Sequence, residues 1–272
     1  MSVGQNIFEK NKIYHGDCLE VMKQIPDKSI NLIVTSPEYY GAPMWENKIT
    51  YDDYLLFHEK VIDEAIRICV DGGFIIYNVS QMTVNSYPAK QTIGVYPIHL
   101  NIGNMMWSKG LTFREDIIWE KPDGYSNRFG VSVTHPYSKC YTPNQITEHI
   151  LVFRNGKKKS VSKELQIENV LDVEYLKKFR SDIWRMNGKK DKEHPAPFPL
   201  DLVKPLVEFY SLKGDVILDP FAGSSTTAIA CIETKRDWIM IEKEEQYYNL
   251  SLKRVGDFLN SFSHETSNED GK

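Results

Sequence analysis

The chain has 272 residues, a length that suits one large α/β domain or one domain with a substantial insertion. Its 41% hydrophobic and 26% charged residues are ordinary for a globular protein, and no apolar run approaches the roughly 20 residues that span a bilayer. A net charge of −4 does not by itself indicate a nucleic-acid binder, and four cysteines without a CxxC pair argue against structural zinc or a disulfide framework.

Amphipathic stretches and short β-branched runs alternate along the first 120 residues. Apolar residues at helical spacing predict a helix over 18–25, and Asn31–Thr35 follows as a buried strand. A second helix is predicted over Tyr54–Val70, and Asp71-Gly72-Gly73 is predicted to end it. Phe74–Tyr77 is predicted as the next strand. This alternation indicates a sheet with helices packed on it.

The pattern loosens between about 121 and 193. Two strands, Phe113–Trp119 just before this region and His149–Phe153 within it, are predicted as a candidate antiparallel pair. Within the region, only Val170–Phe179 suggests a helix. Between Arg154 and Lys192, Lys and Arg outnumber Asp and Glu by six, in a chain whose remainder is acidic. The region is either an inserted subdomain or a set of long loops. Its charge suits a phosphate backbone or, alternatively, a solvated surface.

The last third returns to the alternating pattern. A proline-rich start leads into a helix over 194–210, and the strand Val216–Asp219, the helix Ser224–Thr234 and the strand Trp238–Ile241 follow. The polar residues 261–272 are predicted to form a disordered tail. Strands that alternate with helices predict an α/β fold, a doubly wound and mostly parallel sheet covered by helices on both faces.

The segment from Val34 to Tyr40, VTSPEYY, directly follows a buried strand, and open α/β sheets bind ligands beyond the carboxyl ends of their strands. The exocyclic amine of a nucleobase is a poor nucleophile because its lone pair is delocalised into the ring. The Ser36 hydroxyl and the Pro37 carbonyl can accept its hydrogens and direct the lone pair at an electrophilic methyl group. Tyr39 can stack on a base swung out of a duplex. The alternative is an ordinary strand-to-loop turn.

A second motif, DPFAGSSTT from Asp219 to Thr227, joins a strand to a helix through a tight turn. Gly223 lets the backbone approach a ligand, and the N–H groups of the first helical turn can bind a carboxylate such as that of S-adenosylmethionine. The motif is neither a GxGxxG loop nor a P-loop, which argues against an oxidoreductase or an NTPase. Glu242 ends the next strand, where doubly wound folds hold ribose hydroxyls; its alternative is a solvated charge.

Together these residues resemble the β class (circularly permuted) of the DNA amino-methyltransferase family, in which the S/D-P-P-Y loop comes early and the F-x-G-x-G loop late. The resemblance covers nearly all of 12–257. It implies a fold of the S-adenosylmethionine-dependent methyltransferase type, with 1–120 as the catalytic half, 121–193 as an inserted target-recognition region and 194–260 as the cofactor-binding half. The catalytic residues that it implies are Ser36, Pro37 and Tyr39. The cofactor-binding residues that it implies are Asp17, Cys18, His194, Pro195, Phe198, Asp219, Phe221, Gly223, Ser224, Ser225 and Glu242.

Two positions depart from the family pattern. Glu38 stands where the family has a second proline, and Ser225 stands where it usually has a second glycine. Serine is small enough for the turn. Glu38 places a carboxylate beside the reactive amine, so that it either tunes specificity or marks a loss of activity.

The function implied by the resemblance is a site-specific methyltransferase that uses S-adenosylmethionine to methylate the exocyclic amine of a flipped base in double-stranded DNA. Serine at position 36 favours cytosine N4. The alternatives are adenine N6, a DNA-binding module that has lost catalysis, and an RNA or small-molecule methyltransferase. The family implies a restriction-modification setting with a cognate endonuclease and allows a homodimer. We expect no metal site, no membrane association and a cytoplasmic location.

Overall fold

The computed structural model describes residues 8–41, 49–85, 92–122, 143, 145–188 and 198–269. Within these residues one sheet has eight strands in the order β1-β10-β9-β2-β3-β7-β6-β8. Its strands are β1 (Lys12–His15), β2 (Ile30–Thr35), β3 (Cys69–Val79), β6 (Thr112–Glu120), β7 (Thr147–Arg154), β8 (Ile183–Arg185), β9 (Val216–Asp219) and β10 (Asp237–Glu242). β4 (Met82–Asn85) and β5 (Thr92–Tyr96) form a separate antiparallel hairpin.

The main sheet is mostly parallel, as the sequence predicts. β1, β10, β9, β2 and β3 run in one direction, and β7 pairs antiparallel with both β3 and β6. The predicted antiparallel pair is confirmed, with Phe113 opposite Phe153. The short edge strand β8 runs parallel to β6. The predicted α/β fold with a doubly wound sheet is therefore correct.

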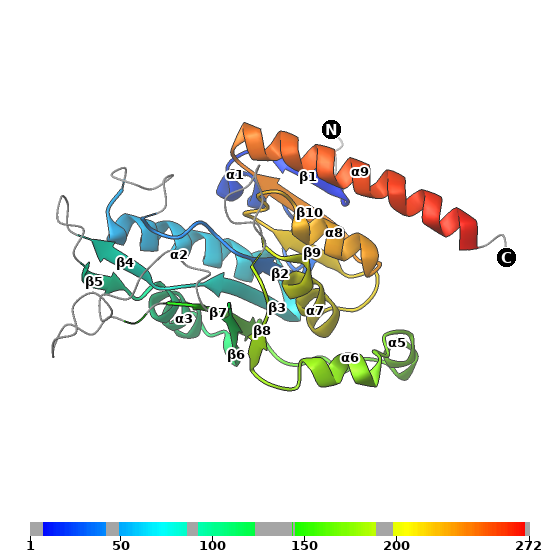
Figure 1. Cartoon of the computed structure of the whole chain (residues 1–272), viewed down its shortest axis with the longest axis horizontal. Helices are drawn as coiled ribbons and strands as arrows, with labels where there is room; N and C mark the ends of the chain where they lie inside the picture. Colours follow the sequence, from blue (N-terminus) through cyan, green and yellow to red (C-terminus); the bar gives the residue numbers. More distant parts are fainter. Residues whose placement is uncertain are drawn as a thin grey trace, which may run out of the picture.

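Helices cover both faces of the sheet (Figure 1). One face carries α1 (Cys18–Met22), α2 (Tyr51–Ile68) and α3 (Ile98–Ser108), and the other carries α7 (Leu200–Tyr210), α8 (Thr226–Glu233) and α9 (Glu245–Glu269). Alternate strand residues pack on opposite faces, so Ile33 and Ile75 join the first core while Leu32 and Ile76 join the second. Every one of these four side chains is fully buried.

The junction of α2 and β3 differs from the prediction. α2 begins at a capping box between Thr50 and Asp53, and β3 starts at Cys69 and continues through both glycines. A Cβ atom at Gly73 would lie 2.6 Å from the Asn31 carbonyl oxygen. Glycine is therefore needed here for β3 to lie against β2, and the glycine pair does not separate two elements.

Two segments of the inserted region predicted over 121–193 belong to the main sheet. β7 lies inside the main sheet, where Ile150 and Val152 are fully buried, and β8 extends its edge. Among the described residues of this region, α5 (Lys163–Glu168) and α6 (Val173–Lys178) stand apart from the sheet and bury none of their residues. Figure 1 shows these two short helices at the lower right, far from the β4–β5 hairpin at the left.

Two boundaries near the C-terminus also differ. α7 begins at Leu200 after the N-cap Pro199, whereas residues 194–197 of the predicted helix lie outside the described residues. α9 runs to Glu269, so the prediction of a disordered tail over 261–272 is wrong for most of that segment. Extending a helix that has already formed costs much less than nucleating one, which lets polar residues continue it. No helix within the described ranges is long and apolar enough to cross a membrane.

Candidate active site

The two sequence motifs meet at the edge of the sheet where β2 and β9 end. These strands are neighbours, and the Thr35 hydroxyl donates a hydrogen bond to Asp219 Oδ1 over 2.7 Å. Thr35 directly precedes Ser36, so this bond joins the predicted catalytic loop to the predicted cofactor turn. The carboxyl edge of a parallel sheet is where open α/β folds bind ligands.

Asp219 fixes the start of the cofactor turn from inside the protein. Its side chain is 3% exposed, Thr227 Oγ1 donates to Oδ2 over 2.7 Å, and the Phe221 N–H donates to Oδ1 over 3.1 Å. Burial raises the pKa of Asp219, and these hydrogen bonds oppose the rise. Because protein groups donate hydrogen bonds to both carboxylate oxygens, the role of Asp219 is to fix the shape of the turn.

The turn has a left-handed backbone at two places, Gly223 (φ 52°) and Ser225 (φ 56°). This conformation favours glycine, which explains why the family usually has a second glycine where this chain has Ser225. The Ser225 hydroxyl is buried and donates to Ser251 Oγ of α9 over 3.0 Å. Ser224 is also buried, and its carbonyl accepts a hydrogen bond from Arg254 over 2.6 Å. Both serines therefore attach the turn to α9.

The first turn of α8 is suited to an anion. Its N-cap residue, Ser225, makes no side-chain capping hydrogen bond. The buried Thr226 hydroxyl has no hydrogen-bond partner in the described part of the chain. N–H groups at a helix start beside an unpartnered hydroxyl fit a carboxylate, such as the one that S-adenosylmethionine carries.

Two carboxylates lie at the adjoining strand ends. Glu242 ends β10, where its Oε2 accepts the Gly223 N–H and its Oε1 accepts the Glu244 N–H, both over 2.8 Å. Burial raises the pKa of Glu242. Asp17 follows β1, caps α1 and lies 3.3 Å from Lys243 Nζ. Carboxylate oxygens accept more than one hydrogen bond each, so both residues can still accept hydrogens from cofactor hydroxyl or amine groups.

The other predicted cofactor residues lie in different surroundings. Cys18 is 5% exposed and its side chain packs in the core, where burial raises the pKa of its thiol to about 12. Phe221 is half-buried in the turn. Phe198 is half-buried just before α7. Because α7 ends near the start of β9, the beginning of α7, and Phe198 with it, lies toward the edge of the sheet where β9 ends. His194 and Pro195 lie outside the described residues.

The catalytic loop is held by side chains of the neighbouring strands. The half-buried Ser36 follows β2, and its Oγ lies 3.1 Å from Nδ2 of Asn78 on β3. Pro37 is buried. The Tyr39 hydroxyl donates to Glu148 Oε2 of β7 over 2.7 Å, which anchors the ring at its hydroxyl end. Burial raises the pKa of Tyr39, and the Glu148 carboxylate raises it further.

Three residues that the sequence reasoning did not single out complete this cluster. Asn78 Nδ2 donates to Glu148 Oε2 over 2.6 Å, and Lys121 Nζ pairs with the other Glu148 oxygen. With Ser36, they form a polar row across four adjacent strands: the end of β2, the end of β3, the start of β7 and the residue after β6. Asn78 could have been noticed as a polar residue in the apolar run 74–79. Glu148 and Lys121 could not, because their proximity depends on strand pairing.

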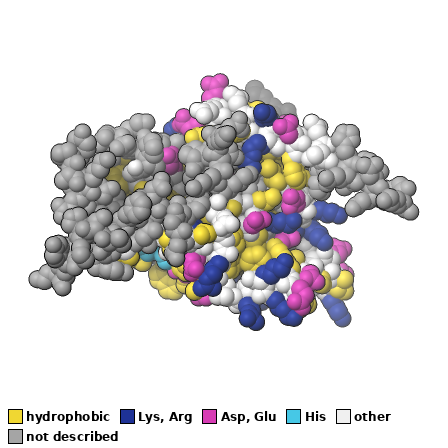
Figure 2. Space-filling model, in the orientation of Figure 1, with side chains coloured by type: hydrophobic (Ala, Val, Ile, Leu, Met, Phe, Trp, Pro, Cys, Tyr) yellow, Lys and Arg dark blue, Asp and Glu magenta, His cyan; other side chains and the backbone are white. Residues whose placement is uncertain are grey.

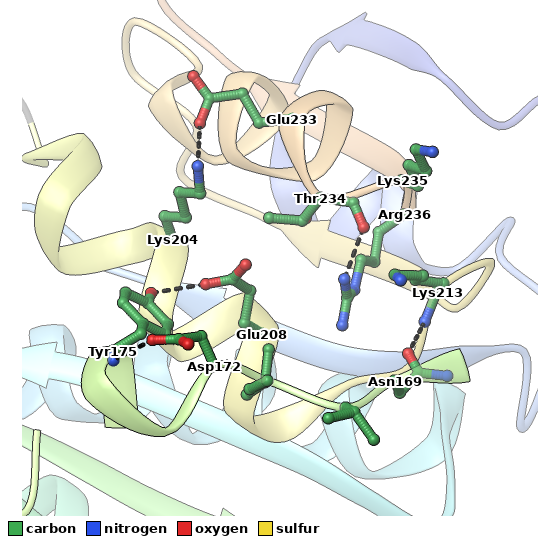
Figure 3. A pocket seen from close by; sticks show the side chains of 12 residues that line it. Asn169, Asp172, Tyr175, Lys204, Glu208, Lys213, Glu233, Thr234, Lys235 and Arg236 are labelled. Atoms are coloured by element: carbon green, nitrogen blue, oxygen red, sulfur yellow. Dashed lines mark hydrogen bonds and ion pairs between the residues drawn. The ribbon is translucent and has the colours of Figure 1, made fainter. Parts of the chain in front are cut away.

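A cavity of about 490 Å³ lies at the opposite edge of the sheet (Figure 3). Its lining includes Lys213, which precedes β9, and Arg236, which precedes β10. Lys204 and Glu233 form an ion pair across its rim. The length of β9 separates this cavity from Asp219, so it is not part of the candidate active site. The described residues hold no group of three metal-binding side chains.

The matching family model, described as DNA methylase, covers residues 30–253, which include the catalytic loop and the cofactor turn. The chain belongs to this DNA methylase family. Its members act on N6 or N4 amino groups, so the chain is a DNA amino-methyltransferase, and the sequence resemblance is confirmed.

The relatives span most of this methylase. It is 30% identical to the type II methyltransferase M.MthZI of Methanothermobacter thermautotrophicus, over 88% of this chain and 74% of that protein. It is also 30% identical to the type II beta methyltransferase M.BslI of a Bacillus species, over 90% of this chain and 27% of that longer protein. The solved structure of TTHA0409 from Thermus thermophilus matches with a TM-score of 0.74 at 30% identity, covering 91% of this chain and 94% of the other. TTHA0409 has also been solved in complex with S-adenosyl-L-methionine, and that structure matches at 28% identity.

Proposed function

We propose that this DNA methylase transfers a methyl group from S-adenosylmethionine to N4 of a cytosine in double-stranded DNA. The observation that carries the proposal is the position of Ser36, one residue beyond the hydrogen bond that joins Thr35 to Asp219 at the start of the glycine turn. A nucleophile held by Ser36 would therefore lie beside a cofactor held by that turn. Serine at this position is the feature that the family resemblance associates with cytosine N4.

The residues at the strand ends fit the proposed cofactor. S-adenosylmethionine, when bound, supplies an electrophilic methyl group. The first turn of α8 and the Thr226 hydroxyl would hold its carboxylate, while Glu242 and Asp17 would accept hydrogens from its hydroxyl and amine groups. The complex of TTHA0409 with the same cofactor supports this assignment.

The catalytic loop would orient the target amine. Ser36 Oγ and the Pro37 carbonyl would each accept one of its hydrogens, which turns the nitrogen lone pair out of the ring and toward the methyl group. Tyr39 would stack on the flipped base, and its bond to Glu148 keeps the ring in place for that contact. A target-recognition role for 121–193 is part of this proposal; residues 123–142, 144 and 189–193 of that region lie outside the described ranges.

The test is to identify the modified base. The protein is incubated with labelled S-adenosylmethionine and mixed genomic DNA, and the nucleosides are separated by mass spectrometry. We expect N4-methylcytosine, and we expect it to form at least about tenfold more slowly with Ser36→Ala under the same conditions. N6-methyladenine would assign the same site to adenine. Tight DNA binding without any methylation would instead favour a module that has lost catalysis through Glu38. A cognate endonuclease and a homodimer remain predictions.

A further inference from the structure

Asn78 is buried at the candidate site with an unusual hydrogen-bond balance. Its side chain is 1% exposed, and its Nδ2 lies 2.6 Å from Glu148 Oε2 and 3.1 Å from Ser36 Oγ. Its Oδ1 is buried, with no hydrogen-bond partner in the described part of the protein. A buried acceptor left unpaired costs stability, so an arrangement that keeps one calls for a functional explanation.

Glu148 determines which way the Asn78 amide faces. A carboxylate only accepts hydrogen bonds, so the amide nitrogen must face Glu148, and the opposite orientation would place two acceptors 2.6 Å apart. Lys121 balances the buried charge of Glu148 from the other side, and its ammonium also lies 4.6 Å from the centre of the Trp119 ring. The amide nitrogen of Asn78 is therefore held as a donor toward Ser36, and this orientation leaves Asn78 Oδ1 without a hydrogen-bond partner among the described residues.

A second buried asparagine shows what a purely structural role looks like in this fold. Asn155, after β7, donates to the carbonyl oxygens of Ile66 and Cys69 over 3.1 and 2.9 Å, and so fastens the backbone. The amide nitrogen of Asn78 instead contacts side chains of the site, those of Ser36, Tyr39 and Glu148. Both residues are buried; Asn78 lies on β3 opposite Ile150 in the middle of β7, whereas Asn155 directly follows the end of β7.

We propose that Asn78 is a positioning residue: held by Glu148 and Lys121, its amide donates to Ser36 Oγ and sets the direction of the serine hydroxyl toward the target amine. The inference rests on the proposed methyl transfer. With one lone pair of Ser36 Oγ occupied by Asn78, the other remains to accept an amine hydrogen. A serine hydroxyl without this donor could rotate among its staggered positions, and only some of them suit the amine.

The test is a double-mutant cycle on the single-turnover rate of methyl transfer, using Ser36→Ala, Asn78→Ala and the double variant. Each single change should slow the reaction about tenfold or more while the Kd values for DNA and cofactor stay unchanged. The double variant should be no slower than the slower single variant, because Asn78 acts through Ser36. Losses that multiply in the double variant, or a wild-type rate for Asn78→Ala, would overturn the inference.

Two further variants separate positioning from folding. Asn155→Ala is the matched control, and it should lower the melting temperature while keeping the single-turnover rate. Glu148→Gln keeps the shape of the side chain but can present a donor, so it should slow the reaction with unchanged KM for DNA; an unchanged rate would count against the inference. If the wild type transfers methyl groups but these variants behave independently, only this inference fails. If the wild type methylates no DNA, the proposed function fails and this inference with it.

Discussion

Glu38 is the residue at which this chain departs most from its family, and the structure separates it from the polar row. Its carbonyl oxygen accepts a hydrogen bond from the Tyr54 hydroxyl over 3.3 Å. Partial burial raises the pKa of Tyr247 in α9, and the Glu38 carboxylate raises it further. Glu38 therefore acts electrostatically on the α9 side of the site, away from the contacts that hold Ser36.

We expect Glu38→Pro to retain methyl transfer within a few-fold of wild type. Proline has a carbonyl, so the hydrogen bond from Tyr54 can persist, and the contacts of Ser36 do not involve Glu38. The measurement is kcat on a DNA that the wild type methylates, with the slowed variant Ser36→Ala as the reference. A loss as large as that of Ser36→Ala would show that the carboxylate takes part in the reaction.

Gly223 combines a positive φ with a backbone N–H bonded to Glu242. We expect Gly223→Leu to abolish binding of S-adenosylmethionine, because its side chain would occupy space at the turn and its backbone would be strained by about 1–2 kcal/mol. Gly214→Leu is the matched control, because Gly214 also has a positive φ and a Cβ atom there would meet nothing within 4 Å. Gly214 lies just before the start of β9, at the end of the strand opposite to the turn. Calorimetry should show lost affinity for the first variant only; equal affinities would contradict the assignment of the turn.

Helices α5 and α6 belong to the basic stretch of the sequence but lie far from the catalytic loop. Figure 2 shows Lys and Arg side chains interspersed with Asp and Glu on the side of the molecule where Figure 1 places these helices. The preceding residues 157–159 are exposed beside Gly72, where a Cβ atom would lie 3.1 Å from the Lys157 carbonyl oxygen. Asn78 is six residues further along β3, roughly 20 Å away at about 3.3 Å per residue.

This distance changes what the basic stretch predicts for DNA binding. The sequence alone suggests that neutralising Lys157, Lys158 and Lys159 weakens DNA binding. From the structure we expect the triple change to glutamine to leave the slope of log K against log salt unaltered. The matched triple is Lys189, Lys190 and Lys192, which lie outside the described residues and precede α7 closely in sequence. We propose that these lysines contact phosphates, so their change should lower the slope by up to about one unit per lost contact. The reverse result would place DNA along α5 and α6.

At the scale of the whole molecule, the packing of α2 on the sheet buries a histidine without partners. His58 is 1% exposed, neither ring nitrogen has a hydrogen-bond partner in the described part of the chain, and its neighbours include the rings of Tyr54 and Phe221. Burial lowers the pKa of His58 to about 3. The folded protein therefore requires the neutral imidazole, whereas the unfolded chain takes up a proton near pH 6.5.

Stability should consequently fall as the pH drops from about 6.5 toward 3. The unfolded chain binds more protons in that window, so this one group should remove about 2 kcal/mol from the free energy of unfolding between about pH 7 and about pH 5. His58→Phe keeps an aromatic ring and removes the titration. Urea unfolding at the two pH values should show a smaller loss for the variant, and parallel losses would contradict the assignment to His58.

The fold class and the two motifs could be predicted from the amino-acid sequence, because both depend on local order. Buried strands, amphipathic helices and a loop directly after a strand can be read from neighbouring residues, and so Ser36 and Gly223 were found. The prediction that Gly73 helps to end a helix was wrong. Glycine is required there by the backbone of β2, which lies far from Gly73 in the chain.

Which polar groups act together depends on long-range packing and could not be predicted from the sequence. The pairing of β3 with β7 and of β7 with β6 brings Asn78, Glu148 and Lys121 to Ser36, and no local pattern encodes a register between distant strands. The same pairing divided the region 121–193, placing β7 in the main sheet and α5 and α6 at the edge opposite the catalytic loop. The net charge of a segment follows from its composition, whereas the position of that segment relative to the active site depends on long-range packing.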